Sequence, residues 1–233
     1  LRYRIDRSEF VDAGVYPTFD ANDYTVVSMF DDGAHGDGPA RDGVYGAEVP
    51  PQPDGTVIEF YIQALDKTGC SRTWPAPSLM DGEAEQVTNA LYRVDASFNP
   101  YAYWQIGSQP LYYMVMTEAE RGRLASLGNR RDHAESHAQM NGTFVSVDGQ
   151  DILLRYNVGI RNRGNGSRLP PPNNYRVNFP KDRRWKGVSA ININSKYTYI
   201  QLLGHAVFHM AGLPALDAKR VQVRVNGENL APL

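Results

Sequence analysis

Residues 143–168 read TFVSVDGQDILLRYNVGIRNRGNGSR. Two apolar-rich runs, 143–147 and 152–160, flank Asp148 and Gly149, and an Asp-Gly pair between two such runs is a strong signal for a β-hairpin. After the second run, arginines alternate with small, flexible residues. This stretch therefore predicts a hairpin whose returning strand leads into a basic loop.

The residues before this hairpin predict a strand followed by a helix. The run 111–116 is apolar and aromatic, as in a strand, and it is followed by Thr117 with Glu120 three positions later. A threonine with a glutamate at that spacing forms a capping box at a helix start. We therefore expect a new domain to open with a strand and a short helix that ends near Leu127 and Gly128.

The residues after the hairpin predict a second helix and a last hairpin. Residues 197–211 place apolar side chains at helical spacing, and Gly212 follows them. This face predicts a core helix through Ile200, Leu203, Val207 and Met210. Residues 221–225 alternate like a strand up to Asn226-Gly227, a turn that requires a return strand. Only residues 228–233 remain to form it, which predicts an incompletely covered sheet.

The first part of the chain predicts an all-β module. Short β-rich runs are separated by Gly, Pro, Asp and Asn, and they cover residues 2–5, 25–30, 44–49, 57–65 and 90–94. The run 57–65 is dense in β-branched and aromatic residues, which favours a strand buried on at least one face. Cys70 is the only cysteine, so an internal disulfide is excluded, and we expect a buried structural thiol.

One loop of this module collects four carboxylates among repeated glycines, namely Asp31, Asp32, Asp37 and Asp42. Calcium takes six to eight oxygen ligands, and glycine permits the turns that aim them inward. The spacing is not that of an EF-hand, because the final glutamate is absent. The alternative is that each aspartate caps its own turn through bonds to backbone N–H groups. Both interpretations stay open at this point.

Charge divides the chain. Residues 1–110 hold 7 Lys and Arg against 17 Asp and Glu, and residues 111–233 hold 17 against 9. The basic part suits phosphate or an acidic surface, although the two parts could also simply attract each other. No run of about 18 apolar residues is present, so we expect no membrane span. The chain begins without Met, and we interpret it as a fragment of a longer protein.

The first module carries a recognisable pattern, DDG…GDG…DGVYGAEVP…FYIQALDKTG, followed by Trp74-Pro75. It resembles the immunoglobulin- or fibronectin-like modules that precede catalytic or anchoring domains in secreted proteins. We therefore expect an immunoglobulin-like β-sandwich over residues 1–95, a packed linker over 96–110, and an α+β domain over 111–233. Such a module usually serves as a spacer.

The basic loop offers Arg161, Arg163 and Arg168, whose guanidinium groups could bind phosphate oxygens or pair with the carboxylates of the first half. It is not a Walker A loop, because no Gly-Lys-Ser/Thr follows. YNVGIRNRGNGSR, then NNYRVNFP, WKGVSAININS, MAGLPA and VQVRVNGENL occur in the order and spacing of the CotH family. Residues 111–233 thus resemble CotH proteins, which are spore-coat and surface proteins whose studied members are atypical kinases.

The resemblance implies ATP and Mg²⁺ as cofactors and transfer of phosphate to a Ser-rich protein. It makes Arg161, Arg163 and Arg168 phosphate-facing, with Asn165 and Ser167 shaping the loop. Family members commonly carry a lysine where this chain has residues 171–174, and Lys181 and Lys186 are the nearby alternatives. The family's metal-binding acidic residues lie beyond Leu233, so the catalytic residues are unknown and we expect this fragment to be inactive alone.

The resemblance to CotH proteins implies two alternative functions. The first is that the parent protein is an atypical protein kinase. The second is a non-catalytic coat, surface or adhesion protein with a degenerate CotH fold, in which the sandwich is a spacer. By resemblance we expect a bacterial secreted or cell-surface location and a protein partner, either a substrate or a coat protein, and no nucleic acid.

Overall fold

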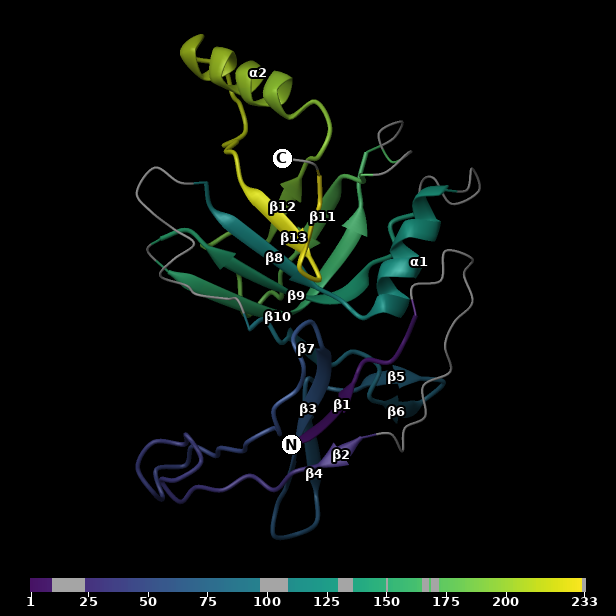
Figure 1. Ribbon diagram of the computed structural model, residues 1–233, viewed down its shortest axis with the longest axis vertical. Coiled ribbons are helices and arrows are strands. Elements are labelled where there is room, and N and C mark those ends of the chain that lie inside the picture. The colour runs from purple at the N-terminus through teal and green to yellow at the C-terminus, as the bar shows by residue number, and fades with distance from the viewer. Residues whose placement is uncertain are drawn as a thin grey trace.

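The computed structural model describes residues 1–9, 24–96, 109–129, 136–149, 151–164, 168 and 172–231. These residues form two β-sheet units, drawn one below the other in Figure 1. The first unit contains β1 (Arg2–Ile5), β2 (Thr25–Val26), β3 (Val57–Leu65), β4 (Ser71–Trp74), β5 (Ser78–Met80), β6 (Glu83–Glu85) and β7 (Ala90–Arg93). The second contains β8 (Leu111–Val115), α1 (Glu118–Asn129), β9 (Met140–Val147), β10 (Ile152–Asn162), β11 (Tyr175–Asn178), β12 (Ala190–Ile193), α2 (Thr198–Met210), β13 (Gln222–Val225) and β14 (Glu228–Asn229).

The long strand β3 organises the first unit. The sheet runs β2-β1-β3-β4, and β7 also pairs with β3, while β5 and β6 form a separate hairpin. The expected strands at residues 2–5 and 57–65 are confirmed, and the strand at 25–30 is shortened to β2. The expected strand at 44–49 is wrong, since only Gly46 bridges Phe30 there. Two prolines follow directly at 50 and 51, and proline cannot donate a ladder hydrogen bond.

The second sheet has the order β12-β11-β10-β9-β8-β13-β14. All its pairs are antiparallel except β8 with β13, which are parallel. Both faces of β8 are buried: Tyr112 and Met114 belong to the main core, and Val115 packs on the first unit with Val57 and Leu91. Burial on both faces explains why residues 111–116 are nearly continuously apolar.

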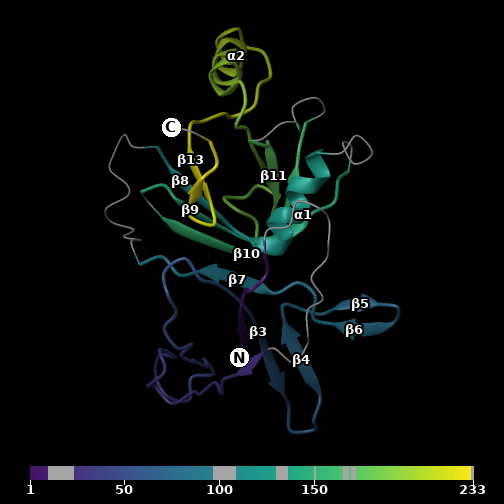
Figure 2. The ribbon, with the colours of Figure 1, turned by 45° about the vertical axis from the view of Figure 1, so that its right-hand side comes forward.

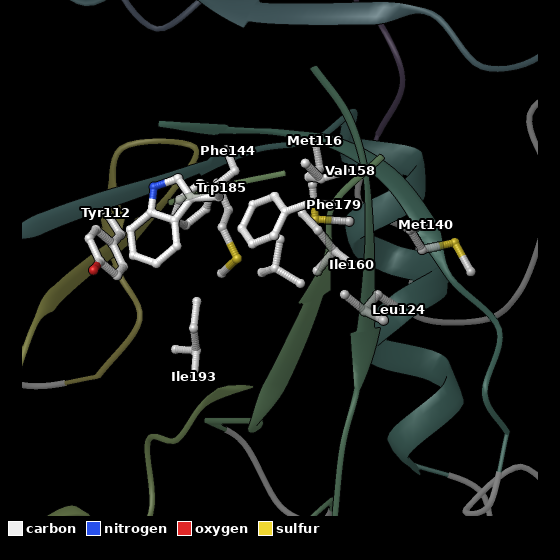
Figure 3. Close-up of a cluster of buried hydrophobic side chains, with 12 residues drawn as sticks. Tyr112, Met116, Leu124, Met140, Phe144, Val158, Ile160, Phe179, Trp185 and Ile193 are labelled. Carbon is white, nitrogen blue, oxygen red and sulfur yellow. The ribbon is translucent and has the colours of Figure 1, made fainter. Parts of the chain in front are cut away.

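The main core lies on one face of this second sheet (Figure 3). Aromatic rings fill its centre: Phe144 lies 5.4 Å from Phe179 and 5.8 Å from Trp185, measured between ring centroids. The indole N–H of Trp185 donates to the Ser146 hydroxyl at 2.8 Å, so its polar group is satisfied inside the core. Leu124 brings α1 onto the same cluster.

The two helices differ in their packing. In α1, the amide of Glu120 donates to the Thr117 hydroxyl at 3.2 Å, as the capping box predicts. The expected second helix is present as α2, but its assignment to the core is wrong. Ile200 is 70% exposed and Met210 is 89% exposed, and α2 projects away from the sheet in both views (Figures 1 and 2). Among the described residues, no helix is long and apolar enough to cross a membrane.

The prediction of a buried Cys70 is also wrong, because this cysteine is exposed. Its amide donates to the Asp66 carboxylate at 2.9 Å, which also accepts from the Thr68 amide at 2.7 Å. The Asp66 carboxylate thus holds a surface turn between β3 and β4, and Cys70 lies at the end of that turn.

The units meet along β7, which faces β9 and β10 (Figure 2). The Leu91 carbonyl accepts from the Thr143 hydroxyl at 2.6 Å, and the Asn89 carbonyl accepts from the Asn141 amide side chain at 2.7 Å. A β-bulge in β10 between Arg155 and Val158 contains Asn157, whose side chain also donates to the Asn89 carbonyl, at 3.2 Å. The bulge therefore turns a side chain towards the first unit.

Candidate functional site

The register of the second sheet places several polar side chains on one face. Arg161 of β10 is directly opposite Arg176 of β11, and Arg176 is directly opposite Asn192 of β12. Arg163 lies two residues beyond Arg161 and therefore shares its face. Ile160 and Val177, the neighbours of these arginines along the strands, are fully buried in the core on the opposite face. The arginines thus form a row on the side of the sheet away from the core.

Each of these arginines contacts a side chain that is not a carboxylate. An Arg161 Nη1–H group is 2.9 Å from His137 Nδ1, and Arg176 Nε donates to the Asn178 side-chain oxygen at 2.9 Å. Arg163 donates to the side-chain oxygen of Asn194, in the segment between β12 and α2. These contacts orient the guanidinium groups without neutralising them.

Arg168 is buried, with an exposed fraction of 3%. Its Nε donates to the Gly164 carbonyl at 2.6 Å, and its Nη1 donates to the Ser136 carbonyl at 2.7 Å. It therefore ties the end of β10 to the segment before β9. Two other predicted loop residues, Asn165 and Ser167, lie outside the described residues.

The positive charges of the arginines affect one another's pKa values. Burial lowers the pKa of Arg161, and the charges of Arg176, Arg168 and Arg163 lower it further. Burial and the charge of Arg176 also lower the pKa of Arg163. Within the described part of the chain, none of the four forms an ion pair with a carboxylate. We call Arg161, Arg163, Arg168 and Arg176 the arginine cluster.

The structure brings the three predicted arginines together and adds a fourth that the sequence analysis missed. Arg176 lies between the apolar Tyr175 and Val177, so the alternation along the strand could have predicted that its side chain faces away from the core. Its position opposite Arg161 could not be predicted, because 12 residues separate β10 from β11 and no two-residue turn fixes their register.

Neither of the two lysines named in the sequence analysis, Lys181 and Lys186, belongs to the arginine cluster. Lys186 pairs with Asp148, and Lys181 is exposed in the turn that follows Phe179. Asn173, in the stretch where CotH proteins commonly carry lysine, is 5% exposed. Its side-chain amide is 3.4 Å from the oxygen of Asn162, and its own oxygen has no hydrogen-bond partner among the described residues.

The four aspartates of the first unit accept hydrogen bonds from backbone amides, and their carboxylates do not converge on one position where a cation could bind. Asp31 accepts from the amides of Asp42 at 3.1 Å and Gly43 at 3.0 Å, and Asp37 accepts from those of Gly33 at 2.9 Å and His35 at 3.0 Å. These bonds lower the pKa of Asp37.

Asp32 and Asp42 behave in the same way. Asp32 accepts from the Ala34 amide, and Asp42 accepts from the Val44 amide, each at 2.9 Å. The described residues contain no group of three or more His, Cys, Asp or Glu side chains that could hold a metal ion. The arrangement supports turn capping, and the calcium site stays a prediction.

Comparison with known proteins bears on the first unit. Residues 13–69 match the family described as the second Ig-like domain of conditioned medium factor. This match supports an immunoglobulin-like N-terminal module and fits a β-sandwich; it covers less than half of the chain. No curated protein matches the chain.

Proposed function

We propose that the second unit binds the phosphates of ATP through the arginine cluster, as part of a CotH-type atypical protein kinase. In such a kinase the γ-phosphoryl group leaves the β-phosphate oxygen of ATP and joins a serine oxygen of a protein, whose proton is released. The resemblance over residues 111–233 and the basic charge of that part support the proposal. The name of the matched family, conditioned medium factor, supports a secreted or surface location.

The observation that carries this proposal is a row of three arginines, Arg161, Arg163 and Arg176, that lies on the face of the sheet away from the core and has no described carboxylate partner. Arginine is planar and offers several N–H donors in a geometry that matches phosphate oxygens. Arg168 is buried and donates to two backbone carbonyls, so within the cluster it holds the end of β10 in place. Because the other three arginines have no described carboxylate partner, their positive charge stays available to an anion.

Magnesium fits this part of the chain less well than phosphate does. Hard cations prefer carboxylate oxygens, and the side-chain oxygens described at the cluster are asparagine oxygens that already accept from arginine. We therefore assign no magnesium ligand. The arginines alone account for phosphate binding in this proposal.

A second function is favoured by a separate observation. The apolar side chains of α2 are exposed over most of the helix, including Leu203 and Phe208. An exposed apolar helix face is typical of a contact surface. In the alternative proposal, the second unit is a non-catalytic coat or adhesion domain, and the first unit is its spacer.

The test is isothermal titration of ATP with Mg²⁺ into the purified chain. We expect saturable binding that an Arg161→Ala, Arg163→Ala double variant weakens by at least ~100-fold, since each charged hydrogen bond contributes about 1.5–3 kcal/mol. Arg183→Ala is the matched control, because Arg183 is exposed outside the cluster. Equal binding by the double variant, or no binding by the folded wild type, would contradict the proposal and favour the coat or adhesion function.

A further inference from the structure

The pairing of Arg161 with Arg176 is unfavourable in the absence of an anion. Directly opposite residues of an antiparallel pair have Cβ atoms about 4.5–5.5 Å apart, and like charges at such positions destabilise a sheet. The charges of Arg168 and Arg163 add to this repulsion at Arg161. A bound anion between the guanidinium groups removes it.

The spacing of the row indicates the size of that anion. The backbone positions of Arg161 and Arg176 are one strand spacing apart, about 4.8 Å, and Arg163, just after the end of β10, is two extended residues from Arg161, about 6.8 Å. Three arginine side chains that start from these positions can reach more than one phosphate group. A chain of linked phosphates can contact all three at once.

The surroundings of the arginine row are polar, which suits recognition of a charged ligand with many hydrogen-bond acceptors. Among the described residues, those that hydrogen-bond Arg161, Arg163 and Arg176 are asparagines, a backbone carbonyl and His137. Small-molecule sites that select a particular organic group are lined mainly by apolar and aromatic side chains. The core on the other side of the sheet contains such side chains, whereas the described hydrogen-bond partners of the arginine row are polar.

We propose that Arg176, held by Asn178, acts with Arg161 and Arg163 to bind a linear chain of at least two phosphates, whatever nucleoside is attached to it. This inference rests on the proposed function, because it concerns the same site and deepens it. In this inference the contacts with the phosphate chain supply the binding energy. Arg176 joins the residues that contact the phosphate chain.

The first experiment uses the wild-type chain and inorganic tripolyphosphate. We expect tripolyphosphate to compete with ATP and to bind within ~3-fold of its affinity, with GTP in the same range. Inorganic monophosphate should bind at least ~100-fold more weakly, because it reaches fewer guanidinium groups. An affinity for tripolyphosphate more than ~10-fold below that for ATP would overturn the inference.

The second experiment tests Arg176 directly. Arg176→Gln should weaken ATP and tripolyphosphate equally, by ~10-fold or more, and Arg176→Lys should lie between wild type and Arg176→Gln. Arg183→Gln is the control, and circular dichroism with thermal unfolding confirms that each variant is folded. Unchanged binding by a folded Arg176→Gln variant would overturn the inference.

The outcomes separate the two proposals. ATP binding that neither tripolyphosphate nor Arg176→Gln affects contradicts this inference and leaves the proposed function standing. Tripolyphosphate binding without ATP binding contradicts both, because the inference requires that an attached nucleoside makes no difference to binding. Failure of the folded chain to bind either ligand contradicts both.

Discussion

Glu120 is an acid placed where ionisation is unfavourable. Its carboxylate accepts from the Asn141 amide at 3.0 Å, at the contact between α1 and β9. Burial raises the pKa of this carboxyl to about 7, and the negative charge of Glu59 in the first unit raises it as well. Near neutral pH, Glu120 is therefore divided between its protonated and ionised forms in the folded chain.

The raised pKa makes part of the stability depend on pH. Between pH about 4.5 and 7, the folded state keeps a proton at Glu120 that the unfolded state has lost, so stability falls as pH rises through this window. We expect Glu120→Gln, which keeps a carbonyl acceptor, to remove a pH-dependent loss on the order of 3 kcal/mol. Urea unfolding of both proteins at pH 5 and pH 8 measures it. An equal pH dependence in the two proteins would contradict the assignment.

At the scale of elements, the start of α1 is completed by the first unit. The Asp6 carboxylate accepts from the Glu118 amide at 2.8 Å, and the Ser8 hydroxyl accepts from the Ala119 amide at 2.9 Å. The first amides of a helix have no partner inside the helix. Residues more than a hundred positions away therefore satisfy amides that Thr117 does not reach.

This contact predicts the effect of a single substitution far from the helix in sequence. Asp6→Ala should destabilise the chain by about 1 kcal/mol, the usual effect of removing a helix cap. Hydrogen exchange should then be faster at the amides of Glu118 and Ala119. Asp182→Ala is the control, since Asp182 is exposed in a turn of the second unit. Unchanged exchange at both amides in Asp6→Ala would show that the cap contributes nothing.

The elements that the sequence could predict are those with local signals. The Asp-Gly and Asn-Gly turns, the capping box at Thr117 and the period of residues 57–65 each identify an element correctly. The strands β11 and β12 were missed, because their four-residue runs have no turn signal of this kind. The helical period of α2 was recognised, but periodicity does not tell whether an apolar face is covered.

The residues of the candidate site that could be predicted are also those with a local signal in the sequence. Arg161, Arg163 and Arg168 lie within one short segment, so the sequence could group them. The pairing of β11 with β10 places Arg176 and its hydrogen-bond acceptor Asn178 at the site. Asn194 lies there because the segment before α2 passes close to Arg163. Contacts made by register between distant strands leave little trace in a single sequence.

At the scale of the whole molecule, the two units share buried surface. Val57 and Leu91 of the first unit form one cluster with Val115 of the second. Edge-to-face rings add to this contact, with Tyr156 of β10 lying 5.5 Å from Phe60 and 5.8 Å from Trp74 between ring centroids. The first unit is thus packed against the second along β7 and β3, which is more contact than a simple spacer requires.

We therefore expect the chain to unfold in one transition. Calorimetry should show a single peak, and hydrogen exchange should release β3 and β10 together. Leu91→Ala should destabilise both units by about 2–5 kcal/mol, because Leu91 is fully buried at their contact. Two resolved transitions, with only the first shifted by Leu91→Ala, would show that the units are independent.

The parallel pairing of β8 with β13 has a consequence for biosynthesis. Leu111 lies opposite Gln222, so one edge of β8 stays unpaired until the ribosome has added more than a hundred further residues. During that interval β9 can already pair with β8, and β10 with β9, while the other edge of β8 remains open to neighbouring chains. We therefore expect nascent chains that stall before residue 222 to aggregate more readily than the complete chain.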